Sequence, residues 1–570
     1  MILIFLAWVV LFFVVSLLGL TFYQIASRIV SKRLLPENIK WYEVFWLGII
    51  FLILLLQIFS LFFPINKYFW VLILIINFIA FVFYLLGGRV SIGWFQKKFV
   101  ERRNLLFFII LGAVILLSVC YNASRNVVWY DTYMYHLNAV RWVSYYKVVP
   151  GLVHIDSLYG FNSSFFLFGA MTDELFFTGK SSHIALSFLI VVIIVQWLYV
   201  IFLEKRVSLF ERIFCLGTFP LLLHKAWANE LPSLSTDLAS LIIFFALSLF
   251  LISQTKIKHL ILAGLGAILV SFKLSGLIAA SFVFAFILLS AYRFGGKDKK
   301  DLRLIYFSVI TFLLILAGFI VRNIFVSGWL FYPFPYFGNL YLPWSTSIEN
   351  VSKSLWVIKA WARMPGVHHD IVANMTLIKW LVPWFENFKI QIEFKLFLLS
   401  LMALILTMSI EQIRKYLGNY IFSYSTLIII NITSLFFWFY AAPDLRFGQQ
   451  YYWAFFATAL YPLISYFLKS NGKRNWWVIY SLVFFLSIFM AEYFPKITEV
   501  PQILTLKKEE SLPVDAIVAS PPGENPPLIL WVPVKGDQCG NSQLPCSTEK
   551  RKIRQIVPGD ISKGFLPYFN

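Results

Sequence analysis

Long apolar runs recur along this chain from Met1 to about Tyr493, and they constrain its fold more than any other feature. A transmembrane helix needs about 20 mostly apolar residues to cross roughly 30 Å of hydrocarbon. Charged residues make up only 13% of the 570 residues, whereas a soluble protein carries about a quarter. We therefore predict an all-α membrane protein with about fourteen spans: 2–26, 42–63, 69–86, 104–121, 181–203, 208–224, 236–253, 258–272, 274–292, 305–325, 393–410, 420–440, 449–468 and 475–493.

The first apolar stretch, Ile2 to Leu20, has the alternative interpretation of a signal peptide. A signal peptide carries basic residues before its apolar region and a small-residue cleavage site after it. Neither is clear here, so we interpret the stretch as the first span.

Basic residues give the chain a formal net charge of +20, which in a soluble protein would suggest a nucleic-acid partner. Here they cluster in short turns between the predicted spans, and basic turns are typically cytoplasmic. All seven basic turns fall on one side under the fourteen-span prediction, so we expect both termini on the opposite side and no nucleic-acid partner. The turns contain Arg28, Lys32, Arg33 and Lys40; Arg89, Lys97, Lys98, Arg102 and Arg103; Lys205, Arg206 and Arg212; Lys256 and Lys258; Arg293, Lys297, Lys299, Lys300 and Arg303; Arg414 and Lys415; Lys469, Lys473 and Arg474.

Three long segments are expected on the non-cytoplasmic side: the loops 122–181 and 325–391 and a polar, Pro-rich tail. Long loops often carry binding or catalytic residues. The predicted domains are a transmembrane part, 1–494, and an extracytoplasmic tail, 495–570. There is no Walker A pattern and no G-x-G-x-x-G between a strand and a helix, and we expect no cofactor.

The first of these loops begins with an aspartate just after a span. The spacing of apolar residues after Asp131 predicts an amphipathic helix in the membrane interface, ended by Pro150-Gly151. A second interfacial segment is predicted over Phe161 to Phe177. Asp131 is either the N-cap of the helix that starts at Thr132 or a general base at the membrane surface. His136 would lie about one helical turn further on, within reach of the same ligand, or would be a packing residue.

Three cations are predicted at the outer ends of spans: Lys273, Arg322 and Arg446. Each could hold a phosphate at the level of the lipid headgroups, and each could equally be a side chain that snorkels to the interface. Lys273 fits snorkelling least well, because it lies in a short apolar hairpin with few polar neighbours.

Two acidic residues, Glu230 and Asp237, lie in the outer loop that ends at about residue 238. Asp237 could assist Asp131 or bind hydroxyls of a ligand, but an acid in the first turn of a helix is also stabilising on its own, and we favour that interpretation. His368-His369-Asp370 suggests a metal site, yet no further ligand has a suitable spacing, so we predict no metal.

Two cysteines, Cys539 and Cys546, lie in the tail with a separation that allows them to close a small loop. In an oxidising compartment we expect them to form a disulfide. The alternative is two free thiols.

Together these motifs resemble the GT-C superfamily of polytopic glycosyltransferases, and more closely an uncharacterised bacterial GT-C-like membrane family. The resemblance rests on Y-D-T-x-x-Y-H, V-P-G-L and G-F-N-S-S between 130 and 164; S-T-D-L at 235–238; K-L-S at 273–275; R-N-x-x-x-S-G-W-x-x-Y-P at 322–333; P-D-x-R-F at 443–447; and G-D-Q-C-x6-C in the tail. It covers most of the chain from about residue 120. In better-known GT-C enzymes the acidic motif follows the first span, whereas about four predicted spans precede it here.

The resemblance implies a GT-C-like bundle with juxtamembrane helices and an inverting, metal-independent transferase in a bacterial inner membrane. Its donor would be a polyprenyl-phosphate-linked sugar, because nucleotide sugars stay in the cytoplasm. Asp131 would be the base, with His136 and Asp237 beside it, while Lys273, Arg322 and Arg446 would bind the donor phosphate. The acceptor, a glycan, lipid or protein, is left open.

Three other functional classes are alternatives for a multi-pass membrane protein of this kind. A transporter or flippase of lipid-linked glycans would place ionisable residues at mid-membrane and show broken helices in repeated halves. This sequence has few charges within its predicted spans and no such halves, and its ionisable residues collect at one face. An O-antigen ligase or polymerase would have a large outer loop late in the chain and no early acidic motif. A non-catalytic scaffold is a third alternative.

Overall fold

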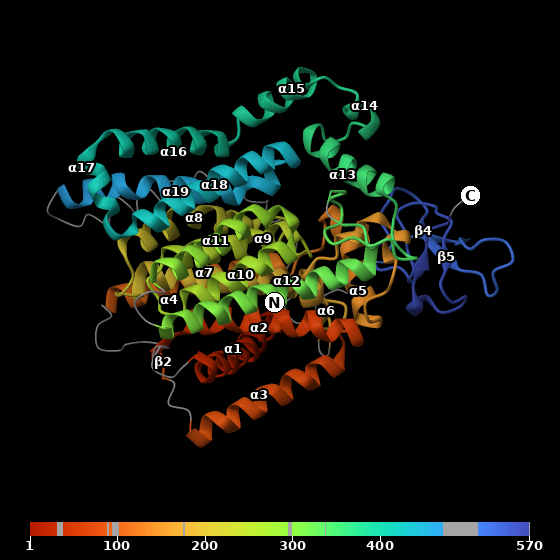
Figure 1. Ribbon diagram of the computed structural model, residues 1–570, viewed down its shortest axis with the longest axis horizontal. Helices are drawn as coiled ribbons and strands as arrows, with labels where there is room; N and C mark the ends of the chain where they lie inside the picture. Colours follow the sequence, from red (N-terminus) through yellow and green to blue (C-terminus); the bar gives the residue numbers. More distant parts are fainter. Residues whose placement is uncertain are drawn as a thin grey trace.

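The computed structural model describes residues 1–30, 38–87, 91–93, 102–174, 177–294, 299–336, 338–470 and 511–568. A bundle of long helices makes up most of this part of the chain (Figure 1). The bundle helices are α1 (Ile2–Val30), α2 (Trp41–Phe62), α3 (Lys67–Gly87), α4 (Arg102–Ala123), α7 (Ser181–Leu198), α8 (Leu209–Trp227), α9 (Thr236–Ile252), α10 (Lys258–Phe272), α11 (Leu277–Phe294), α12 (Lys299–Ser327), α16 (Ile392–Ser409), α18 (Ile421–Ala441) and α19 (Leu445–Ser470). The short helices η5 (Tyr199–Leu203), η6 (Leu274–Gly276), α17 (Glu411–Arg414) and η7 (Lys415–Tyr420) connect them.

Thirteen of the fourteen predicted spans coincide with one of these helices, and the last, 475–493, lies outside the described residues. Within the described residues, eight helices are long and apolar enough to cross a membrane. Three shorter apolar stretches also occur among the described residues: Lys67–Val82 within α3, α9 and α10. Of these, α9, with 17 residues, reaches only roughly 25 Å at 1.5 Å per residue. Among the described residues, the helices that meet this criterion are fewer than the predicted spans, and a multi-pass integral membrane protein is confirmed.

Short helices fill the loop after α4. They are η1 (Thr132–His136), α5 (Leu137–Tyr145), η2 (Leu152–His154), η3 (Ser157–Phe161) and α6 (Ser164–Thr172). The η1 segment is a π-helix, a rare form that often occurs at functional sites. All nine residues of α6 are buried, so this part of the predicted interfacial segment faces the protein interior. The helix is apolar on every side, from Phe165 to Met171, and such a helix is buried in the protein interior.

The second long loop forms α13 (Ile348–Arg363), α14 (His369–Ala373) and α15 (Leu377–Lys389). In Figure 1, α5, α13 and the C-terminal strands lie toward one end of the bundle, and β2 and α17 lie toward the other. We call the first end the site end. It is where α4 and α10 finish and where α9 and α19 begin.

The C-terminal residues 511–568 form a small β module, which corrects the all-α prediction for this part of the chain. Strand β3 (Val514–Val518) pairs antiparallel with β4 (Ile529–Pro533), with Ala516 opposite Trp531. Strand β5 (Arg554–Gln555) pairs with β6 (Phe565–Leu566), and η8 (Ile561–Lys563) lies between them. Elsewhere β1 (Asn38–Lys40) pairs parallel with β2 (Ser91–Gly93). The predicted domain boundary at 494/495 falls outside the described residues.

Candidate functional site

Asp131 stands just before η1 at the site end, and its side chain makes no capping hydrogen bond to the helix that follows. The carboxylate is instead paired with a residue 315 positions further along the chain, because Nη1 of Arg446 lies 3.2 Å from its Oδ2. The N-cap interpretation of Asp131 therefore has no support in the geometry. Its side chain keeps 26% of its surface exposed, so a ligand can reach it.

Asp237 lies in the first turn of α9, as the sequence predicts for a helix N-terminal acid. The hydroxyl of Ser235 caps this helix and accepts from the backbone N–H of Asp237 at 3.3 Å. The carboxylate of Asp237 is nevertheless paired as well, with the ammonium of Lys273 at the end of α10. Both interpretations of Asp237 are thus compatible with its position.

The P-D-x-R-F motif starts α19 and brings a third carboxylate to this cluster. Oδ1 of Asp444 accepts from the backbone N–H of Arg446 at 3.0 Å, and Oδ2 lies 3.4 Å from Nε of the same arginine. That Nε is also 3.9 Å from Oδ2 of Asp237. Two indoles fix the loop, since Nε1 of Trp384 donates to the Pro443 carbonyl at 2.6 Å and Nε1 of Trp438 donates to the Asp444 carbonyl at 2.7 Å.

We call Asp131, Asp237, Lys273, Asp444 and Arg446 the charged cluster. Four of its members were predicted as site residues, but Asp444 was not. Its signal in the sequence is an aspartate two residues before an arginine at a helix start. Phe447 was also missed; the ammonium of Lys273 lies 3.5 Å from the centre of its ring, a cation–π contact.

Electrostatics favour a reactive carboxylate in this cluster. Its three carboxylates and two cations leave a formal charge of −1. Burial raises the pKa of Asp131, and the Arg446 guanidinium opposes that rise. Burial likewise raises the pKa of Asp444, again opposed by Arg446. A carboxylate with a raised pKa is a better proton acceptor than an ordinary surface aspartate.

His136 is buried at the end of η1 and packs against Tyr135 and Phe166, with ring centres 4.4 and 5.3 Å away. Burial lowers its pKa to about 3, so its ring is neutral at physiological pH. Among the residues that the structure describes, its buried Nδ1 has no hydrogen-bond partner. The histidine lies near the charged cluster, but its packing against two aromatic rings also fits the predicted alternative of an interfacial packing residue.

Arg322 does not join the charged cluster. Its guanidinium donates to Oδ1 of Asn162 at 2.9 and 3.2 Å and to the hydroxyl of Ser60 at 2.6 Å. Asn162 has a left-handed backbone and also donates to Asn323 at 2.8 Å, so this arginine fixes the loop before α6. We therefore leave Arg322 out of the proposed phosphate site, in contrast to the sequence prediction.

Three further sets of residues from the sequence analysis lie outside the charged cluster. Glu230 is buried, pairs with Lys225 at 2.7 Å and accepts from the Ser235 hydroxyl at 2.6 Å, which ties it to the cap of α9. The ligand atoms of His368, His369 and Asp370 lie within 4.8 Å of one another on the surface around the start of α14. Cys539 and Cys546 form a disulfide, in agreement with the prediction.

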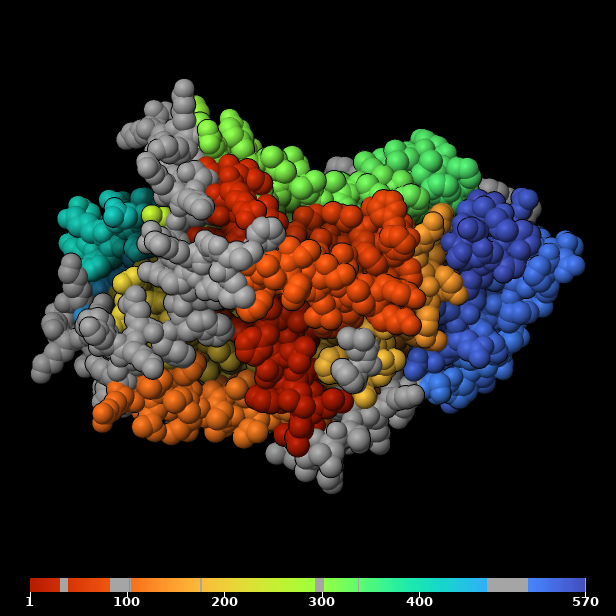
Figure 2. Space-filling model, turned by 90° about the horizontal axis from the view of Figure 1, so that it is seen from below, coloured from red at the N-terminus to blue at the C-terminus, as the bar shows by residue number. Residues whose placement is uncertain are grey.

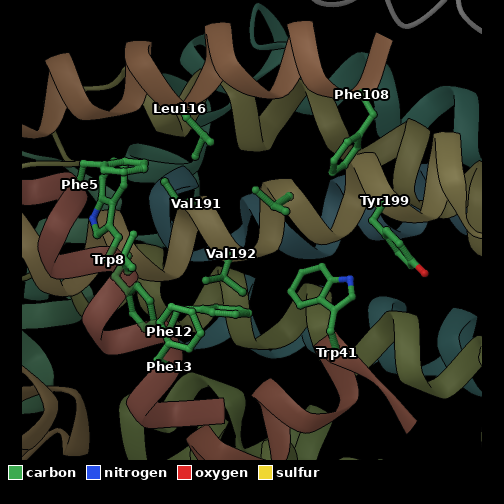
Figure 3. Close-up of a pocket in the computed structure, with 13 residues that line it drawn as sticks. Phe5, Trp8, Phe12, Phe13, Trp41, Phe108, Leu116, Val191, Val192 and Tyr199 are labelled. Atoms are coloured by element: carbon green, nitrogen blue, oxygen red, sulfur yellow. The ribbon is translucent and has the colours of Figure 1, made fainter. Parts of the chain in front are cut away.

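An apolar cavity of about 290 Å³ lies between α1, α4 and α7 (Figure 3). Aromatic and aliphatic side chains line it, and none of the residues in its lining belongs to the cluster: Phe5, Trp8, Val9, Phe12, Phe13, Trp41, Phe108, Leu116, Phe188, Val191, Val192, Val195 and Tyr199. Such a lining suits only an apolar group.

The helices and the charged cluster define a multi-pass integral membrane protein with an ionisable site at one end of its bundle. The chain belongs to the family described as "Domain of unknown function (DUF8201)", whose model matches residues 1–453. Comparisons with curated proteins and with solved structures gave no match. The family match includes the whole charged cluster and ends before the C-terminal β module.

Proposed function

We propose that this protein is a membrane glycosyltransferase that moves a sugar from a polyprenyl-phosphate-linked donor to an acceptor on the non-cytoplasmic face of a bacterial inner membrane. The observation that carries the proposal is the ion pair between Asp131 and Arg446, within a cluster that also contains Lys273. It places a carboxylate of raised pKa beside two cations at the ends of membrane helices. A sugar transfer from a lipid phosphate needs a proton acceptor and cations of this kind.

The reaction balances without a metal or a redox partner. The acceptor hydroxyl gives its proton to Asp131, and its oxygen forms a bond to the anomeric carbon from the face opposite the phosphate. The bond between the anomeric carbon and the phosphate oxygen breaks, and its electron pair stays on the phosphate. Polyprenyl phosphate leaves, and the configuration at the anomeric carbon is inverted.

Lys273 and Arg446 are the proposed phosphate ligands, and both are already paired with carboxylates. The donor phosphate would compete for the Arg446 guanidinium and separate it from Asp131. Because Arg446 lowers the pKa of Asp131 in the unliganded site, neutralising it would raise that pKa further. Binding of the donor would thus prepare the base for the step that follows.

The first test is binding of polyprenyl phosphate, with the matching polyprenol as control. We expect the phosphate, and not the alcohol, to raise the unfolding temperature of the purified protein, since a ligand that binds the folded state stabilises it. Arg446→Gln should abolish the shift. Equal shifts with both lipids, or none with either, would contradict the proposed phosphate site.

The second test is transfer itself. Polyprenyl-phosphate-linked hexoses labelled in the sugar are supplied to membranes that contain the wild-type protein or an inactive variant. We expect label to move from the lipid phosphate to another molecule only with the wild type. A protein that exchanges lipid-linked sugars between the two leaflets without breaking the sugar–phosphate bond would instead support the flippase alternative.

A further inference from the structure

The C-terminal β module is hydrogen-bonded to the backbone on both sides of Asp131. Nε2 of Gln538 donates to the carbonyl of Tyr130 at 3.0 Å, and the backbone N–H of Gly540 donates to the carbonyl of Tyr133 at 2.8 Å. The backbone that carries the aspartate is thus bonded to residues more than 400 positions later in the chain. Figure 2 shows the module, in blue, packed directly against the orange segment that follows α4.

The same stretch of the module is also bonded to side chains around Asp131. The hydroxyl of Tyr130 donates to Asp537, and Nδ2 of Asn138 donates to the Gly540 carbonyl at 3.1 Å. Arg141 of α5 donates to the carbonyl of Ser542. All these contacts come from residues 537–542, which include Cys539.

The Cys539–Cys546 disulfide links this stretch to a second, firmly anchored one. The carbonyl of Cys546 accepts from the Tyr159 hydroxyl at 2.8 Å, and the neighbouring Pro545 carbonyl accepts from the Trp531 N–H at 2.9 Å. Two residues further on, the Thr548 N–H and hydroxyl donate to Oδ2 of Asp156 at 2.8 and 2.7 Å. The disulfide therefore connects the part of the module that is fixed on β4 and η3 to the part that contacts the residues on either side of Asp131.

The segment that follows Asp131 depends on such support. η1 runs directly into α5, and the joint helix from Thr132 to Tyr145 has a length at which an isolated helix is marginal in water, with a rare π form in its first part. Asp131 itself makes no capping bond that would fix it locally. Its position must therefore come from tertiary contacts.

We propose that Asp537–Cys546, closed by its disulfide, is a clamp that positions Asp131 for proton transfer. Gln538 and Gly540 are positioning residues, and they act through the backbone of Tyr130 and Tyr133. The inference rests on the proposed function for the role of Asp131, but the clamp itself can be measured without any transfer assay. Reduction of the disulfide should loosen Asp131, and the protein would then work only in an oxidising compartment.

The test compares hydrogen exchange of the peptide 130–137 in the full-length protein. The variants are Gln538→Ala and the double variant Cys539→Ser/Cys546→Ser. The matched control is Gln555→Ala, whose native side chain accepts from the Gly559 N–H inside the module at 3.1 Å. Wild-type protein treated with a phosphine reductant is a fourth sample. Cys120 and Cys215 are free and buried, so the reductant has only the one disulfide to open.

Exchange of 130–137 should become roughly two- to tenfold faster in both variants and after reduction, as expected when one hydrogen bond or its support is lost. It should not change in Gln555→Ala. In the transfer assay, kcat should fall roughly tenfold or more, because small misplacements of a catalytic group are costly. Binding of polyprenyl phosphate should stay the same, whereas a globally misfolded protein would lose both.

Unchanged exchange at 130–137 in both variants would overturn the clamp. Faster exchange with a normal kcat would overturn its positioning role. If the wild-type protein shows no transfer with any donor, the proposed function fails, and faster exchange in the variants would still support the clamp as a structural device.

Discussion

Asp131 carries the proposed chemistry, and the contacts of this single side chain separate its possible roles. An N-cap contributes through a hydrogen bond to the helix backbone, and Asp131 makes none. Its contact is an ion pair with Arg446, which has Asp237 and Asp444 as further acidic neighbours. If Asp131 lost its negative charge, Asp237 and Asp444 would still balance the positive charge of Arg446.

Asp131→Asn should cost on the order of a hundredfold or more in transfer rate, because an amide cannot accept the proton of the acceptor hydroxyl. Its stability should stay within about 1 kcal/mol of wild type, since no capping bond is lost. Initial rates and thermal unfolding of the purified variant measure the two effects. A variant with full activity would move the base to another carboxylate of the charged cluster.

The pH dependence follows from the raised pKa of Asp131. The base must be deprotonated, so the transfer rate should fall as pH is lowered through a value above the ordinary range of aspartate. Ionisation of Asp131 changes the free energy of unfolding in the direction opposite to that of a typical paired carboxylate, whose folded-state pKa is lowered. A folded-state pKa above the unfolded one means that the charged form destabilises the fold, and this cost disappears in acid. Asp131→Asn should remove both the acid limb of the rate profile and this contribution to stability.

Lys273→Met should reduce stability as well as phosphate binding, because it leaves the buried carboxylate of Asp237 without its nearest cation. Breaking a fully buried pair costs about 3–5 kcal/mol, and the 24% exposure of Lys273 should make the loss smaller. The double variant Lys273→Met/Asp237→Asn should recover most of the unfolding temperature and still fail to bind polyprenyl phosphate. A double variant that binds the phosphate normally would show that Lys273 is structural only.

At the scale of elements, the helices of the bundle could be predicted because an apolar run of sufficient length is a local property of the sequence. The burial of α6 could not, because Phe165 and its apolar neighbours would give the same pattern in a lipid interface as in the protein interior. Arg322 and Arg446 show the same limit. Both lie near the ends of predicted spans, yet one binds Asn162 and the other joins the charged cluster.

The β module illustrates a different limit. Its strands have only two to five residues, so their alternation is too short to read, and their pairing depends on a disulfide and on contacts with the loop after α4. Four members of the charged cluster were predicted from the sequence, because each follows or precedes an apolar run. Asp444 also lies between two apolar runs, but its pairing with Arg446 is visible only in the fold. The packing of α9, α10 and α19 decides which of these charged side chains lie next to one another.

The orientation of the elements can be tested with single-cysteine reporters in a background that lacks the native cysteines. Tyr145 and Tyr336 are exposed near the site end, and Tyr292 and Lys415 are exposed near predicted basic turns. An impermeant maleimide should label the first two positions in intact cells and the other two only after the membrane is opened. Labelling of Tyr145 only in opened cells would place Asp131 in the cytoplasm and contradict the proposed function.

At the scale of the whole molecule, the charged cluster and the clamp come from different parts of the chain. The family match covers residues 1–453, and the module that holds Asp131 begins beyond it. The helical part contains the apolar surface needed for membrane insertion, whereas the module contributes hydrogen bonds, such as those between Thr548 and Asp156. Insertion and activity should therefore be separable.

A chain truncated after residue 510 should still insert into the membrane. It should also bind polyprenyl phosphate, because Lys273 and Arg446 remain. Its transfer rate should fall at least as far as that of the clamp variants. A protease site inserted shortly before residue 511 provides the matched control. Cleavage there leaves every contact between the module and the loop after α4 intact, so the cleaved protein should keep the module bound and retain its transfer activity. Size-exclusion chromatography and initial rates measure both results. A truncated chain with wild-type rates would show that Asp131 is positioned by the helical bundle alone.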